Sequence, residues 1–515
     1  MSIGRRRFLQ DSAKISSLAL FTTGLVDPLR LLAEGQGPQV DQKLFPGEKE
    51  VWDGVVFMNG LGTRYTGSPA HEKYMAFLDE KLAALGLQVQ KIPHTALVRW
   101  DVGKHGVKIA AGAGAGREVP ISSFCTYSAT TGPEGVTGDL VYCGSIGSPT
   151  TALNQTGAGR GGTSLALQAD MKGKIALVEV AAQPVPFGEW FRGHVREVYN
   201  SEGLAELPEL ENTAAFAGFG MPRSLASDLL KAGALGIIYA WTNLSDDNAA
   251  GQTKMGAWGP LPALWVGLKT GKELRQLAQS GGRVTLALEA ETTPDVPTHT
   301  ILATLPGMSS DEIILLWTHT DGNNAIEENG GIAMLNLMKY FSRLSKTSRN
   351  RTIVCVISEG HYAEQYVPTS AWVKERPDLI EKAVALVSIE HLGCREWVDD
   401  PVANTYKGSG RPETGWAFCP TTPMPDVMVD SLKGTNAGKI AVMDSDVHSF
   451  SPGMAAYRAA KVPTIAYICT PPYLLAEGPN GHIQKLDSRQ YHEQVRAFGN
   501  VIHRLDKMPK SSLKS

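Results

Sequence analysis

Residues 312–344 read EIILLWTHTDGNNAIEENGGIAMLNLMKYFSRL and combine two apolar segments with an acidic loop between them. The first segment, EIILLWT, has the length and composition of a buried strand, while GGIAMLNLMKYFSRL carries apolar residues at helical spacing. Between them, one His, one Asp and two Glu fall within ten positions. This order predicts a strand that ends in a polar loop and is followed by a helix, as in a parallel sheet.

The same alternation continues toward the carboxyl terminus. Strands are predicted at RTIVCVIS (351–358), KAVALVSIE (382–390) and KVPTIAYIC (461–469), and a closing helix at 489–505. Strands that alternate with helices predict an α/β fold with a mostly parallel sheet sandwiched by helices. In such sheets ligands gather at the carboxyl ends of the strands, which is where the acidic loop lies.

The amino-terminal half has a different sequence pattern. Residues 47–90 read as helical, whereas 106–295 hold Gly-rich loops and short strands such as GKIALVEV and GALGIIYAW. This second segment resembles a protease-associated domain, a β-rich insert of several exported peptidases. The sequence therefore predicts a main domain formed by 37–105 together with 296–515, interrupted by an insert at 106–295.

Composition excludes several classes of protein. The 515 residues are 43% hydrophobic and carry a net charge of −3, so no general attraction to nucleic acid or to an anionic membrane is expected. The six cysteines are scattered and form no CxxC pair, which excludes a zinc finger or a small disulfide scaffold. Most of them are expected to be small buried hydrophobes.

The amino terminus carries a targeting pattern. RRRFLQ at 5–10 precedes the short apolar stretch ISSLALFTTGLV at 15–26. This pattern resembles a bacterial twin-arginine export signal, and the apolar run is too short for a permanent membrane anchor. Residues 1–36 are therefore predicted to be a signal peptide read by the twin-arginine export machinery, and the protein to be periplasmic or secreted.

Acids and histidines recur after the predicted strands. A divalent metal needs several carboxylate or imidazole ligands that converge on one point, and strand-end loops can supply them from distant parts of the chain. The candidate residues form four groups, which are His319, Asp321, Glu327 and Glu328; Glu359 and His361; Glu390 and His391; and His482.

With these residues in place, the chain resembles the co-catalytic zinc aminopeptidases and glutamate carboxypeptidase-type metallopeptidases. LLWTHTDG is similar to the strand that leads to the family's H-x-D, and NAIEENGGIA to the loop that carries the bridging Asp. RTIVCVISEGHY is similar to the strand that ends in a Glu-Glu pair, VSIEHLG to the strand that ends in Asp, and GHIQKLD to the segment with the final His. The motifs occur in the family's order.

The resemblance implies a site that holds one or two zinc ions. The implied metal ligands are His319, Glu327, His361, Glu390 and His482. Asp321 would orient the His319 ring, and Glu359 would be the catalytic base. Glu328 competes with Glu327 for the bridging position if the loop register shifts by one residue.

Several positions depart from the family pattern. Two Asp ligands have become Glu, and the Glu-Glu pair has become Glu359-Gly360-His361, which places Gly360 where the base is expected. Glu359, His391 or His448 are the groups that could supply a base instead. For His391, a hydrogen bond to a neighbouring loop is the simpler expectation.

The expected activity is that of an exported zinc-dependent hydrolase, a metallo-aminopeptidase or a carboxypeptidase-like enzyme, that cleaves a peptide or other small amide with a metal-activated water. Two alternatives stay open at this point. The same fold could perform a cyclase-like, transferase-like or lyase-like reaction on one metal, or it could bind peptides without catalysis.

Overall fold

The computed structural model describes residues 38–147, 164–165, 170–203, 206–209, 211–213, 224–252, 259–363, 369–447, 449, 451–478 and 480–513. The predicted signal peptide lies outside these residues, and so does His448. Among the helices of the described part, none is long and apolar enough to cross a membrane.

The predicted α/β sheet is confirmed. Its central strands are neighbours in the order β14-β13-β15-β20, and each pairs in parallel with the next. Beyond β20 the sheet continues through β18 and β19, and on the other side β12 pairs antiparallel with β14. The bounds are β12 Arg283–Leu305, β13 Ser309–His319, β14 Arg351–Ser358, β15 Ala383–Ile389, β18 Thr414–Phe418, β19 Lys439–Met443 and β20 Thr464–Cys469.

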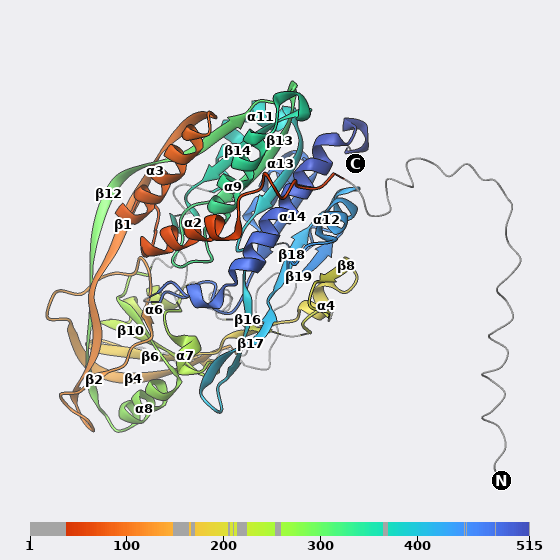
Figure 1. Ribbon diagram of the computed structural model, residues 1–515. Helices are drawn as coiled ribbons and strands as arrows, with labels where there is room; N and C mark the ends of the chain where they lie inside the picture. The colour runs from red at the N-terminus through yellow and green to blue at the C-terminus, as the bar shows by residue number, and fades with distance from the viewer. Residues whose placement is uncertain are drawn as a thin grey trace, which may run out of the picture. The chain divides into compact units, whose positions relative to one another are not determined.

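Helices cover both faces of these strands because successive strand side chains point to opposite sides. Ile314 and Leu316 of β13 belong to the larger hydrophobic core, which α2, α3, α9 and α14 share. Leu315 and Trp317 belong to a second core that includes side chains of α10, α11 and α13. Figure 1 shows α9 and α14 running across the strands. The helices are α2 Glu48–Gly60, α3 Pro69–Ala84, α9 Gly330–Arg343, α10 Trp372–Glu375, α11 Pro377–Lys382, α13 Ala455–Ala460 and α14 Ser488–Lys507.

Local signals explain where two of these helices begin. The Ser68 hydroxyl accepts a hydrogen bond from the His71 amide, and Pro69 occupies the first position of α3, where a missing N–H has no cost. The Asp487 carboxylate caps α14 in the same way through the Gln490 amide at 2.7 Å. The predicted helices in these regions are confirmed.

Most strands of the segment at 106–295 are hydrogen-bonded into the main sheet and do not form a separate sheet. Its strands β4, β6 and β10 pair in parallel, and β4 joins the long strand β12. Within the described residues, one sheet of 16 strands therefore runs through both regions. Two further hydrophobic cores lie within this region. The strands are β1 Gln88–Ala111, β4 Val136–Ile146, β6 Lys174–Val180 and β10 Gly236–Trp241.

One piece of this segment belongs to the main sheet. β8 (Val195–Asn200) pairs antiparallel with β19, and α4 (Phe187–Phe191) places Phe187 and Phe191 against Trp416 of β18. The boundary expected at 106–295 is therefore crossed in space by residues 187–200. The six cysteines are all buried, as was expected for most of them.

Candidate metal centre

The site lies at the ends of three neighbouring parallel strands. His319 is the last residue of β13, His361 follows β14, and Glu390 and His391 follow β15. Because β13 lies between β14 and β15, these residues meet at the carboxyl edge of the sheet. Glu327 reaches the same point from the loop between β13 and α9.

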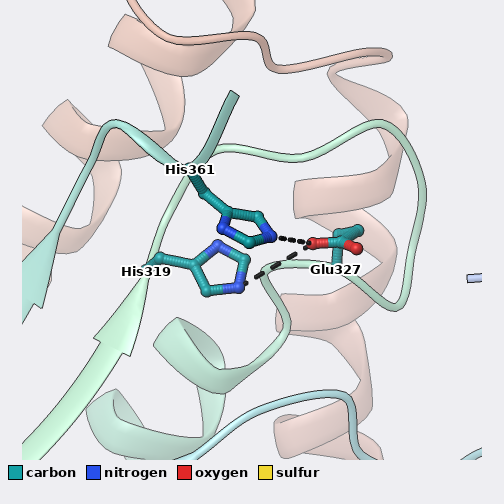
Figure 2. A group of neighbouring side chains, drawn as sticks. All are labelled: His319, Glu327 and His361. Carbon is teal, nitrogen blue, oxygen red and sulfur yellow. Dashed lines mark ion pairs between the residues drawn. The ribbon is translucent and has the colours of Figure 1, made fainter. Parts of the chain in front are cut away.

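The donor atoms of these five residues, called here the donor cluster, lie close together. Oε2 of Glu327 is 3.6 Å from Nε2 of His361, 3.6 Å from Nε2 of His391 and 3.8 Å from Nε2 of His319. Oε2 of Glu390 is 3.7 Å from the same His319 nitrogen. Figure 2 shows the His319 and His361 rings pointing toward the Glu327 carboxylate.

This arrangement fits a metal ion. Zinc binds such ligands at about 2.0–2.2 Å, and two bonds at tetrahedral to trigonal angles place their donors about 3.3–3.8 Å apart. Two overlapping groups satisfy the proximity that one ion requires, namely His319, Glu327 and His361, and His319, Glu390 and His391.

Burial strengthens this interpretation. Five donor atoms are buried and have no hydrogen-bond partner among the described residues: Nε2 of His319, Nε2 of His391, both carboxylate oxygens of Glu327 and Oε2 of Glu390. Unpaired buried polar atoms of this number are costly, and a bound cation would satisfy all of them.

Hydrogen bonds behind the donors fix their orientation. Nδ1 of His391 donates to the Cys469 carbonyl at 2.8 Å, which leaves Nε2 as the free donor atom toward the cluster. Oε1 of Glu390 accepts from the hydroxyls of Ser388 (3.1 Å) and Ser451 (2.7 Å), so that Oε2 faces the cluster.

Asp321 acts differently from the expectation. Nδ1 of His319 donates to the backbone carbonyl of Asp321 at 3.1 Å. The Asp321 carboxylate instead accepts from the Thr66 hydroxyl at 2.6 Å and from the Tyr362 amide at 2.7 Å. Its backbone orients the ring, and its side chain joins the His319 loop to the segment after β14.

Burial and neighbouring charges shift the pKa values of these ligands in different directions. Burial, followed by the neighbouring His361 and His391 rings, lowers the pKa of His319 well below its usual value. Burial raises the pKa of Glu390. For His391, burial alone would lower the pKa, but the Glu327 and Glu390 carboxylates outweigh it and raise the pKa.

The structure separates the two adjacent glutamates. Glu328 forms a fully buried ion pair with Arg64, away from the donor cluster. Glu327 is held in the cluster by Asn324, whose Oδ1 accepts from the Glu327 amide at 3.2 Å and whose Nδ2 donates to the Leu474 carbonyl at 2.6 Å. Of the two, only Glu327 can serve as a donor here.

Glu359 lies outside the donor cluster. Its Oε1 is bonded to Nδ1 of His94 at 2.5 Å, and its Oε2 accepts from the Thr300 hydroxyl at 2.8 Å. On its other side, Nε2 of His94 is 3.0 Å from the Glu375 carboxylate. Burial raises the pKa of Glu359, and its hydrogen bond raises the pKa of His94 to about 9.

His482 is also separate from the two donor groups. Its Nε2 is buried without a hydrogen-bond partner, and burial lowers its pKa to about 4. His391, for which the sequence favoured a plain hydrogen bond, makes one to the Cys469 carbonyl and is also a member of a donor group. The signal for it was its place directly after Glu390 at a strand end. His391 has a left-handed backbone conformation (φ 58°), which breaks the alternation of side chains along the strand. The adjacent side chains of Glu390 and His391 can therefore both face the cluster.

Comparison with known proteins identifies solved structures that share this fold. No protein-family model and no curated protein sequence matches the chain. Among solved structures, a peptidase M28 precursor from Shewanella amazonensis SB2B matches with a TM-score of 0.61 at 17% identity, over 93% of this chain and 96% of that one.

Two aminopeptidases are also similar. The zinc aminopeptidase BSAP from Bacillus subtilis has a TM-score of 0.55 at 14% identity, over 91% of this chain and 98% of its own. The aminopeptidase from Aneurinibacillus sp. strain AM-1 has a TM-score of 0.50 at 14% identity, over 89% and 93%. The chain therefore has the fold of the M28 peptidases.

Proposed function

We propose that this protein is a zinc-dependent hydrolase that cleaves a peptide or other small amide bond. The observation that carries the proposal is the donor cluster, in which three imidazoles and two carboxylates from separate loops converge with buried, unpartnered donor atoms. The fold shared with zinc aminopeptidases supports it.

The donor cluster would hold the ion through His319, Glu327, His361, Glu390 and His391. A bound zinc ion supplies Lewis-acid polarisation of a carbonyl group and lowers the pKa of water. The protein's own part is to fix the donors, through the carbonyls behind His319 and His391, and to keep the centre buried. His482, implied as a ligand by the family resemblance, would need to move to join this set.

Proton transfer is assigned to Glu359 in this proposal. It is a buried carboxylate two residues from His361. Among the described residues each of its oxygens has one hydrogen-bond partner, which leaves a lone pair for an incoming proton. His94 then connects Glu359 to Glu375, whose side chain is 38% exposed, so the three groups form a path to solvent.

The finer assignment is an exported aminopeptidase. The zinc enzymes with this fold that the comparisons returned are described as aminopeptidases. Export rests on the twin-arginine pattern at 5–10. We assign the segment at 106–295 a protease-associated role in substrate access, because Gln252 donates to the Pro472 carbonyl (2.8 Å) and Gly251 accepts from the Glu477 amide (2.7 Å), in the loop after β20.

Zinc analysis and a substrate screen test the proposal together. The zinc-loaded protein should hold one or two equivalents and hydrolyse aminoacyl anilides or dipeptides. His319→Ala should lose both zinc and activity, whereas His105→Ala, at a partly exposed position beside an irregularity in β1, should keep both. Protein without zinc affinity, or with zinc but no hydrolysis of any amide, would contradict it.

Glu359→Gln tests the base separately. It should retain zinc but lose about 10²–10⁴-fold in kcat, the usual contribution of a general base. An unchanged kcat would remove Glu359 from this role and leave the hydrolase proposal intact.

A further inference from the structure

A cavity of about 500 Å³ lies where β18 and β19 begin. Its walls include the hairpin of β16 (Arg395–Asp400) and β17 (Thr405–Pro412), the segment after β8, and Pro472. These strands are labelled together in Figure 1. No member of the donor cluster lines this cavity, so it is separate from the metal centre.

One wall of the cavity carries a buried carboxylate with a free oxygen. Glu413 is only 8% exposed, and its Oε1 accepts from the Thr414 amide at 2.8 Å. Its Oε2 has no hydrogen-bond partner within the described part of the chain. Burial raises the pKa of Glu413 to about 7. A buried carboxylate in this condition is stabilised by a cationic or hydrogen-bond-donating partner.

A half-buried ammonium group lies on the next strand. Lys439 is the register partner of Thr414 in the β18–β19 pair, so it neighbours Glu413 at the same sheet edge. Its Nζ forms no hydrogen bond or ion pair with any residue that the structure describes, Glu413 included. Burial lowers the pKa of Lys439, although Glu413 acts in the opposite direction.

Most other charges around the cavity already have partners. Glu396 pairs with Arg411 at 2.7 Å and Glu202 with Arg395 at 2.9 Å. Asp399 accepts from the Ser245 amide at 3.1 Å. Glu206 is exposed at the rim. Away from the rim, the charged groups left to bind a ligand in the cavity are therefore the Glu413 carboxylate oxygen and the Lys439 ammonium.

Part of the remaining lining is suited to an apolar side chain, although polar residues such as Asn200 and Asn243 also line the cavity. Trp397, Leu207, Pro412 and Pro472 contribute to the walls. A concave site with apolar walls and a few convergent polar groups is the usual form of a small-molecule site, and about 500 Å³ falls within the usual range.

We propose that this cavity binds a free apolar α-amino acid as a zwitterion, with its ammonium on Glu413, its carboxylate on Lys439 and its side chain against Trp397. A zwitterion supplies both missing partners at once, whereas a simple cation or anion supplies only one. This inference does not depend on the proposed hydrolase activity.

Calorimetric titration of L-leucine into the full-length His319→Ala protein tests the site with the metal centre disabled. Saturable binding is expected. N-acetyl-L-leucine lacks the ammonium and L-leucinamide lacks the carboxylate, so each should bind at least about 10-fold more weakly, as expected for loss of one charged hydrogen bond. No saturable binding of leucine, or equal binding of all three compounds, would overturn the proposal.

Two variants and a control locate the site, each added to the His319→Ala background. Glu413→Gln and Lys439→Met should each weaken leucine binding at least about 10-fold, while Glu206→Gln at the rim should change it less than about 2-fold. Circular dichroism verifies folding, and the ligand series provides the test if one variant does not fold. A folded Glu413→Gln or Lys439→Met protein that binds leucine as its parent does would refute the assignment.

Discussion

Replacing Glu327 or Glu328 by Gln should have opposite consequences, although the two residues are adjacent and equally buried. Neither oxygen of Glu327 has a hydrogen-bond partner among the described residues, so the metal-free fold loses no hydrogen bond when this carboxylate becomes an amide. Glu328 pairs with the buried guanidinium of Arg64, which its replacement would leave as an uncompensated charge.

The magnitudes follow from these contacts. Loss of one partner of a buried ion pair costs about 3–5 kcal/mol, so Glu328→Gln should lower the free energy of unfolding by about 3 kcal/mol or more, tempered by the remaining bonds from Arg64 to backbone carbonyls. Glu327→Gln should change the stability of the metal-free protein by less than about 1 kcal/mol. Its zinc affinity should fall more than about 100-fold, because loss of an outer-shell partner alone costs about 10–100-fold.

Urea unfolding of the metal-free proteins and competition titration with a chromophoric zinc chelator measure the two quantities. If Glu328→Gln loses zinc and keeps its stability while Glu327→Gln does the reverse, the bridging residue is Glu328 and the reasoning fails.

Further predictions address the loops and the protons. Gly251→Ala should destabilise the protein more than Gly281→Ala, although both glycines have φ of 75°. An added Cβ at Gly251 would lie 1.6 Å from the Glu477 carbonyl oxygen, whereas one at Gly281 would meet nothing within 4 Å. Equal urea midpoints for the two variants would contradict this prediction. Ser451→Ala removes the 2.7 Å hydrogen bond to Glu390 and should weaken zinc binding about 10–100-fold. Ser431→Ala should leave zinc affinity unchanged, because the Ser431 hydroxyl donates to the Val427 carbonyl within its own helix. Equal affinities in the two variants would argue against Glu390 as a ligand. Zinc affinity should fall as pH decreases, beginning above pH 6.5, because the raised pKa of His391 keeps a proton there that zinc must displace; pH-independent binding between pH 6 and 8 would exclude His391.

The fold was largely predictable because its strands are local apolar runs. In β14 every residue is buried, and the apolar run RTIVCVIS predicts this burial from local sequence alone. β8 was not predictable as part of the main sheet. Its sequence, VREVYN, is short and half-exposed, and its pairing with β19 is set by tertiary contacts across more than 200 residues.

The candidate site was predictable in its location but less so in its membership. Strand ends placed His319 and Glu390 together, since parallel strands share one carboxyl edge. The choice between Glu327 and Glu328 depended on Arg64, which lies about 260 positions upstream and has no local signal. The inclusion of His391 depended on one positive φ angle, which sequence periodicity does not report.

A crystal of the zinc-loaded protein, with an anomalous difference map at the zinc edge, tests the central claim most directly. The account predicts a peak bonded to Glu327 at about 2.0–2.2 Å, with Nε2 atoms of His319 and at least one of His361 and His391 at similar distances. A protein that takes up no zinc, or a peak away from Glu327 and His319, would contradict it.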